Sequence, residues 1–86
     1  MPRISEFYGI VIAMFYDDHR PPHFHAYYGD HRAVIGIQPV GVLRGWLPRR
    51  AQSLIFEWAA IHQAELARNW ERARLKEPLA NIEPLE

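Results

Sequence analysis

Cysteine is absent from this chain, and lysine occurs only once, at Lys76. Without cysteine the chain cannot form a disulfide bond, which fits a reducing compartment. The chain is also short, and 86 residues are enough for one domain and one core. A domain of this length buries only about 60 to 65% of the surface of its unfolded chain. A metal ion, a partner chain or a second copy could therefore supply additional stability.

Net charge and long hydrophobic segments are absent as well. The ten basic and ten acidic residues cancel, which argues against a protein that coats nucleic acid through bulk charge. Nine of the ten basic residues are arginines, whose forked donors favour a defined carboxylate or phosphate partner. Residues 1–6 lack the features of an export signal, and the apolar run at 10–16 is too short to cross a bilayer. We expect a cytoplasmic protein with no membrane association.

Four antiparallel strands are predicted in the first half of the chain. Residues 10–16 are apolar at every position, which is typical of a central strand covered on both faces. Residues 23–28 alternate, so that one face is core and the other is a working surface. Gly29 and Asp30 form a turn into a strand at 33–38, and a second turn leads into a strand at 42–47.

A single long helix is predicted after Pro48. Apolar residues recur at steps of three and four through Ala73, although His62 interrupts the stripe. Such a helix would be about 42 Å long, whereas a globule of this size is about 30 Å across. Either the helix breaks near His62, or its end with Trp70 projects and packs on another molecule. We favour projection into a homodimer or a partner.

The predicted fold class is therefore α+β, an antiparallel four-stranded meander packed by one long C-terminal helix, continuous or broken. A single domain spans 1–86, with the sheet half at 1–47, the helix at 48–76 and a tail at 77–86. Trp46 and Trp58 are expected in the core.

His23 and His25 are the first candidates for chemistry. They lie two residues apart on a predicted strand, so both imidazoles leave the same face, with the bases of the two side chains about 6.5 to 7 Å apart. Together they could share a zinc, manganese or iron ion with one further ligand. That ligand would come from the preceding loop or from the helix, where the candidates are Asp18, His19, His62 and Glu65.

The same segment also permits chemistry without a metal. His23 or His25 would act as general base or acid, Asp18 would orient an imidazole, and Arg20 would stabilise charge on a phosphate. Tyr27 would add stacking or a hydrogen bond, and this set suits RNA cleavage. A structural role is the third interpretation, in which the prolines shape a turn and the imidazoles are bonded to Asp17, Asp18 or backbone carbonyls.

Two further groups are candidates for binding. Arg49 and Arg50 lie in the first helical turn, where free backbone N–H groups and two guanidinium groups would hold a phosphate or a partner's carboxylate. Trp70, near the projecting helix end, is the candidate for an interface.

Residues 18–29, with Pro22-His23-Phe24-His25 at their centre, resemble the bacterial domain-of-unknown-function 4160 family. The resemblance extends to 2–10, 45–50 and 58–70, which is nearly the whole chain. It implies a small α+β protein often encoded beside a second small protein, in an arrangement similar to a toxin and antitoxin pair. It brings no mechanism and no catalytic residues.

Three functions follow as hypotheses. The first is a toxin-like component that acts on RNA or another phosphate-bearing target and pairs with a small antitoxin-like protein from a neighbouring gene. The second is a metal-binding, hydrolase-like domain that uses His23 and His25. The third is a non-catalytic protein-binding module that uses Trp70, Arg49, Arg50 and the tail.

Overall fold

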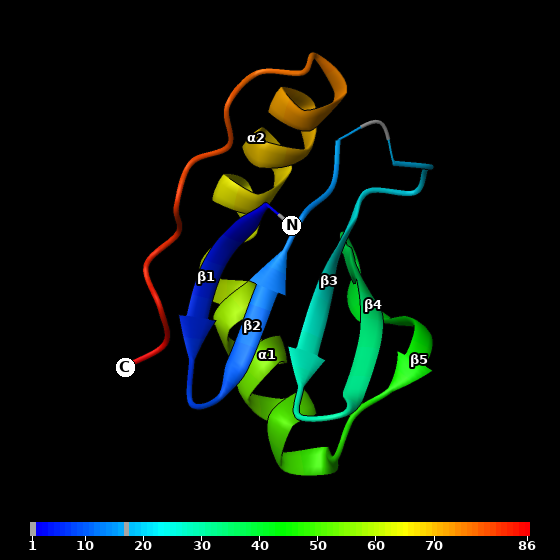
Figure 1. The fold of residues 1–86 in the computed structure, drawn as a ribbon, viewed down its shortest axis with the longest axis vertical. Coiled ribbons are helices and arrows are strands. Elements are labelled where there is room, and N and C mark those ends of the chain that lie inside the picture. Colours follow the sequence, from blue (N-terminus) through cyan, green and yellow to red (C-terminus); the bar gives the residue numbers. More distant parts are fainter. Residues whose placement is uncertain (1, 17) are drawn as a thin grey trace.

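A computed structural model describes residues 2–16 and 18–86 of the chain, and they form one antiparallel sheet and two helices (Figure 1). The strands follow one another in the sheet in chain order, and each pairs with the next. The elements are β1 (Arg3–Phe7), β2 (Ile10–Ala13), β3 (His23–Tyr28), β4 (His31–Ile37), β5 (Val40–Trp46), α1 (Arg49–Ile61) and α2 (Gln63–Arg74). The α+β class and the meander are confirmed.

Strand β1 corrects the predicted number of strands from four to five. The strand was missed because its residues do not alternate strictly, since the register with β2 shifts between Arg3 and Ser5. Ile4 and Phe7, three residues apart, are therefore both buried. Strand β2 is also shorter than predicted, and the chain leaves the sheet after the Met14 N–H donates to the Pro2 carbonyl oxygen.

The core lies between the sheet and the helices. Alternation along β3 turns Phe24 and Ala26 toward the helices, and both are fully buried. Trp58 of α1 is fully buried at the centre, with its ring centroid 5.3 Å from that of Phe7 and 5.7 Å from that of Phe24. The helices therefore cover one face of the sheet, and the opposite face is available for a site (Figure 1).

The helix breaks at His62, which confirms the first of the two alternatives and gives two helices instead of one continuous helix. His62 has φ −109° and ψ 24°, and it separates α1 from α2. Both helices then fit within a molecule whose longest extent is 33 Å. Projection of the helix end is therefore wrong, since Trp70 is only 3% exposed and packs within the molecule.

The segment after α2 lies along the molecule beside β1 (Figure 1). The Ile82 N–H donates to the Ile4 carbonyl oxygen, and the Trp58 indole N–H donates to the carbonyl oxygen of Glu83. Asn69 bonds both backbone groups of Ala80. The predicted tail is thus docked on its own chain, where it covers the β1 edge of the sheet.

Trp46 also departs from the prediction, because it is 62% exposed at the end of β5 instead of in the core. It is an edge residue beside His31, with ring centroids 5.0 Å apart. Neither helix in the described part of the chain is long and apolar enough to cross a bilayer.

Candidate functional site

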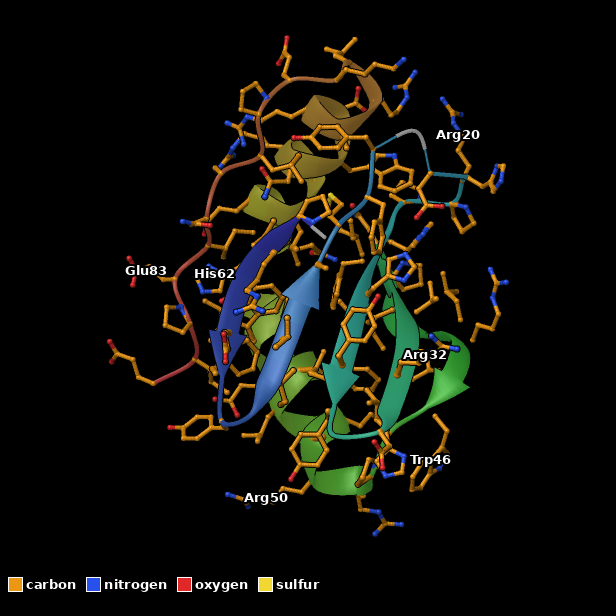
Figure 2. The ribbon with its side chains drawn as sticks, viewed as in Figure 1. Arg20, Arg32, Trp46, Arg50, His62 and Glu83 are labelled. Atoms are coloured by element: carbon orange, nitrogen blue, oxygen red, sulfur yellow. The ribbon has the colours of Figure 1, made fainter. Side chains whose placement is uncertain are left out.

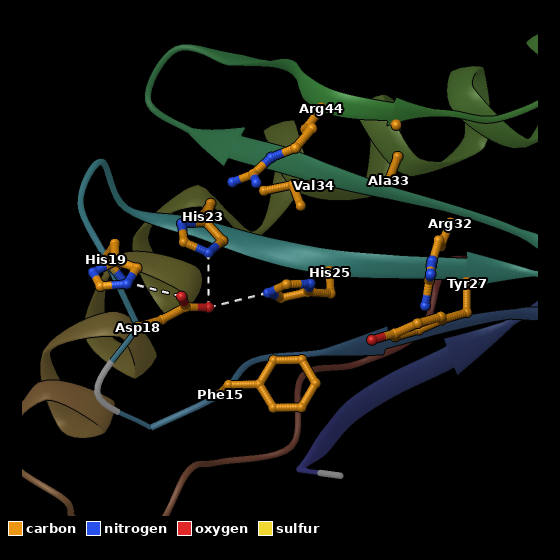
Figure 3. A pocket seen from close by; sticks show the side chains of 11 residues that line it. Phe15, Asp18, His19, His23, His25, Tyr27, Arg32, Ala33, Val34 and Arg44 are labelled. Carbon is orange, nitrogen blue, oxygen red and sulfur yellow. Dashed lines mark hydrogen bonds and ion pairs between the residues drawn. The ribbon is translucent and has the colours of Figure 1, made fainter.

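A cleft of about 480 Å³ opens on the face of the sheet that is turned away from α1 (Figure 3). Its walls come from the loop that follows β2 and from β3, β4 and β5. The lining side chains that carry charge or a titratable group are Asp18, His19, His23, His25, Tyr27, Arg32 and Arg44. The cleft thus gathers polar chemistry from four separate segments of the chain.

The alternation of β3 builds the floor of this cleft. His23, His25 and Tyr27 point away from the face that buries Phe24 and Ala26. The two imidazole centroids are 5.2 Å apart. The prediction that both rings leave one side of an extended segment is confirmed.

Asp18 joins the two imidazoles from the loop. Its Oδ2 atom lies 2.8 Å from His23 Nε2 and 3.1 Å from His25 Nε2, and its Oδ1 atom accepts the N–H of His19 at 2.9 Å. Burial alone would raise the pKa of Asp18. The hydrogen bonds from His25, the His19 backbone and His23, together with the charge of His23, outweigh burial and lower the pKa to about 2. Asp18 is therefore a carboxylate at neutral pH.

His23 is held between two oxygen atoms. Its Nδ1 lies 2.8 Å from the Pro21 carbonyl oxygen, which only accepts hydrogen bonds, so Nδ1 must carry a proton and donate it. In the neutral ring Nε2 then has a lone pair, and it faces the ionised Asp18 Oδ2 at 2.8 Å. Two lone pairs do not hold such a contact. A positive species belongs between them, either a second ring proton or a metal ion.

Aromatic rings wall the imidazoles. The Trp70 ring centroid is 5.1 Å from that of His23, and Phe15 meets His25 edge-on at 4.6 Å. The side chain of His23 is 8% exposed, whereas His25 and Asp18 keep 24% and 22% of their side-chain surface exposed. The three groups are therefore fixed from behind and reachable from the cleft.

Arg32 and Arg44 are functional candidates that the sequence analysis missed. Arg32 pairs with Tyr27 across β3 and β4, and Arg44 pairs with Val34 across β4 and β5. Both line the cleft, and neither forms a hydrogen bond or ion pair with residues 2–16 or 18–86. The alternation of residues 31–37 and 40–46 places each arginine on one face of its strand. Only the pairing of the strands shows that this face is the one that carries His23 and His25.

Several predicted site residues lie elsewhere. Arg20 is exposed and does not line the cleft, and Arg50 lies outside it, at the start of α1 (Figure 2). Arg49 and Arg50 flank a shallower hollow at the start of α1. Asp17, named as a hydrogen-bond partner of the imidazoles, lies outside the described residues.

Two further candidates are corrected by the structure. His62 is not in the metal-capable group of Asp18, His23 and His25, because its Nδ1 pairs with Glu65 Oε1 at 2.6 Å on the helices. Trp70 is a buried wall of the site and not an interface residue.

Comparisons with known proteins place the chain in a family without giving it an activity. No curated protein matches the chain, and no solved structure matches it. A family model described as "Domain of unknown function (DUF4160)" matches residues 9–71, from the start of β2 into α2. The match includes every charged or titratable side chain that lines the cleft. Because the match covers well over half of the length of the chain, the chain belongs to the domain-of-unknown-function 4160 family.

Proposed function

We propose that Asp18, His23 and His25 bind a divalent transition metal ion and that this centre performs hydrolysis in the cleft. The observation that carries the proposal is the convergence of three ligand atoms within 4.8 Å of one another, one from each residue. Two histidines and one carboxylate are a ligand set that zinc, iron and manganese use in proteins.

Two of the three spacings between these ligand atoms suit a metal ion. Bonds of about 2.0 to 2.2 Å with angles between about 90° and 109° separate neighbouring ligand atoms by roughly 2.8 to 3.6 Å. The Nε2 to Oδ2 distances of 2.8 and 3.1 Å fall in this range. The two imidazole nitrogens lie up to 4.8 Å apart, so the rings would turn toward each other to share one ion. A metal ion would also replace the positive species that the contact between His23 and Asp18 requires.

The surroundings of His23 support the same assignment. Histidines that bind metals usually donate their second ring N–H to a carbonyl or carboxylate, which fixes the tautomer and the ring orientation. His23 donates Nδ1–H to the Pro21 carbonyl oxygen and packs against Trp70. Its Nε2 is thereby presented as a preorganised ligand.

Three protein ligands beside an open cleft are typical of a catalytic site, because coordination positions stay available for water and substrate. A metal ion lowers the pKa of its bound water, to about 7 in zinc enzymes, and makes that water a nucleophile. Attack of that water on an ester or phosphate ester is the reaction class that this arrangement supports.

A second candidate is acid–base cleavage of RNA without a metal, in a toxin-like protein. The observation that favours it is the contact of His25 with Asp18, because a carboxylate orients an imidazole for proton transfer. Arg32 and Arg44 would stabilise charge on the phosphate. An antitoxin-like partner protein stays a prediction, as does a homodimer.

Metal analysis of protein purified without a histidine tag tests the proposal. We expect about one equivalent of zinc, manganese or iron per chain after dialysis. His25→Ala should lose the metal, whereas His31→Ala, which changes an exposed histidine outside the group, should keep it. A wild-type chain that takes up none of the three metals refutes the proposal. Cleavage of RNA by that metal-free chain, lost in His25→Ala, would support the second candidate.

A further inference from the structure

We infer that Arg32 and Arg44 form a phosphate subsite, which holds the phosphate ester of a ligand against the centre of Asp18, His23 and His25. The inference rests on the proposed function and names its substrate class. The shared chemistry is the phosphate of a nucleotide, either free or within a single strand of RNA.

Strand register brings both arginines to this centre. Val34 pairs with His25 on one side and with Arg44 on the other, so Arg44 lies two strands from His25 in the same row. Two strand spacings are about 10 Å, a gap that an arginine side chain largely spans. In Figure 3 the Arg44 side chain extends over Val34 toward His23.

Arg32 approaches from the neighbouring row. It pairs with Tyr27, which is two residues from His25 on β3 and therefore about 6.5 to 7 Å along the strand. Its side chain lies alongside Tyr27 in Figure 3. The two guanidinium groups thus border the space in front of the imidazoles from different sides.

The charges of the cleft favour an anion. Asp18 is the only carboxylate that lines it within the described residues, and both neighbouring imidazoles already contact that carboxylate. The two guanidinium groups have no partner in the described part of the chain. The chain as a whole has no net charge, so this excess of positive charge is local.

The backbone next to Arg44 is shaped for this placement. The register of β4 and β5 shifts beside Val34, and such bulges redirect side chains near functional sites. Gly45 has φ +87°, and a Cβ atom there would collide with the Arg32 carbonyl oxygen and lie 2.8 Å from the Cα of Ala33. A glycine is therefore required next to Arg44.

Phosphate fits these groups better than carboxylate does. Guanidinium forks pair with two oxygens at a time, and a phosphate ester offers enough oxygens for two forks and a metal ion together. The volume of about 480 Å³ lies in the range of small-molecule sites. Tyr27 supplies a ring and a hydroxyl beside the phosphate position for the rest of the ligand.

Binding of inorganic phosphate tests the subsite. Calorimetry would compare the wild type, Arg32→Gln, Arg44→Gln and the control Arg68→Gln, each with and without zinc, with metal content measured on the same samples. We expect each cleft variant to bind phosphate about tenfold more weakly or worse, with zinc content unchanged. Arg68→Gln should bind as the wild type does, because Arg68 is exposed on α2 and lies outside the cleft.

Equal phosphate affinity in all four proteins would overturn the inference, whatever their metal content. If the wild type binds no metal, the proposed function fails, and the metal-free titrations still decide the subsite by the same comparison. Competition against phosphate by adenosine monophosphate and by a short RNA strand then assigns the source, since the true ligand displaces phosphate at the lower concentration. Failure of both to displace it would contradict a nucleotide ligand.

Discussion

Histidine–carboxylate contacts occur at two places in the described part of the chain, with similar distances and different surroundings. His62 Nδ1 lies 2.6 Å from Glu65 Oε1 on the helices, and the Glu65 side chain is 41% exposed. In the cleft, Asp18 contacts both His23 and His25, and its side chain is 22% exposed. The first contact joins the break between the helices to the first turn of α2, whereas the second joins a loop to a strand.

The comparison teaches that proximity of a histidine and a carboxylate does not make a site. Two residues that are three apart in the chain pair locally, and partly exposed pairs of this kind contribute little to stability. The cleft contact has a third convergent group, a fixed tautomer and an opening toward solvent. These additional features are what the predictions below test.

The largest expected effect is a difference in zinc affinity between variants of His23 and His62. Structural zinc sites contribute about 10 to 16 kcal/mol in total, or roughly 3 kcal/mol per ligand. His23→Ala should therefore weaken zinc binding more than about a hundredfold, as measured by competition with a chelator of known affinity. His62→Ala should change it less than about twofold. Similar losses in both variants would remove the distinction between the two contacts.

The next effect concerns the wall behind His23. Trp70→Phe removes part of a buried indole and should lower the free energy of unfolding by about 1 to 2 kcal/mol. Zinc affinity should fall by a few-fold because the imidazole loses its support. Trp46→Phe, at a position that is 62% exposed, is the control. Its free energy of unfolding, measured by urea denaturation, should change by less than about 0.5 kcal/mol. The account is contradicted if the control is the more damaging change.

The pH dependence of the metal-free protein tests Asp18. Its pKa is lowered from the ordinary value of 3.8 to about 2, so its stabilising contribution is complete above about pH 4 and is lost as the pH falls toward 2. The contribution is at most about 2 kcal/mol, reduced by solvent screening. Asp18→Asn should therefore reduce the change in the free energy of unfolding between about pH 4 and pH 2. An unchanged acid slope in this variant would disprove the assignment.

The smallest effect is expected at Glu65. Its contact with His62 is partly exposed, and exposed pairs contribute about 0.2 to 1 kcal/mol. Glu65→Gln should therefore lower the free energy of unfolding by less than about 0.5 kcal/mol at neutral pH and leave zinc affinity unchanged. A loss of metal in this variant, measured as above, would place the helical pair in the site after all.

The predictable part of the fold was the part with a local pattern. Strict alternation at 23–28 placed His23 and His25 on one face, and the structure has them there. Strand β1 was missed because a register shift disturbs its alternation. The length of the helical pattern revealed a conflict with the size of the domain, and the break at His62 resolves it. The docking of the final segment through Asn69 was not predicted, because contacts between distant residues leave no local signal.

In the candidate site, too, local patterns could be predicted and contacts between distant residues could not. Asp18 was found because it lies near the histidines along the chain, and Arg20 was chosen on the same ground although it does not line the cleft. Arg32 and Arg44 reach the site only through the pairing of β3, β4 and β5. Which strands pair, and in which register, depends on contacts far apart in the sequence.

The most direct test of the central claim is anomalous diffraction at the zinc edge from crystals of the wild-type protein grown with zinc. The account predicts one strong peak in the cleft, within about 2.0 to 2.2 Å of His23 Nε2, His25 Nε2 and a carboxylate oxygen of Asp18. A cleft without a peak at saturating zinc, or a peak bound only at His62 and Glu65, would contradict it.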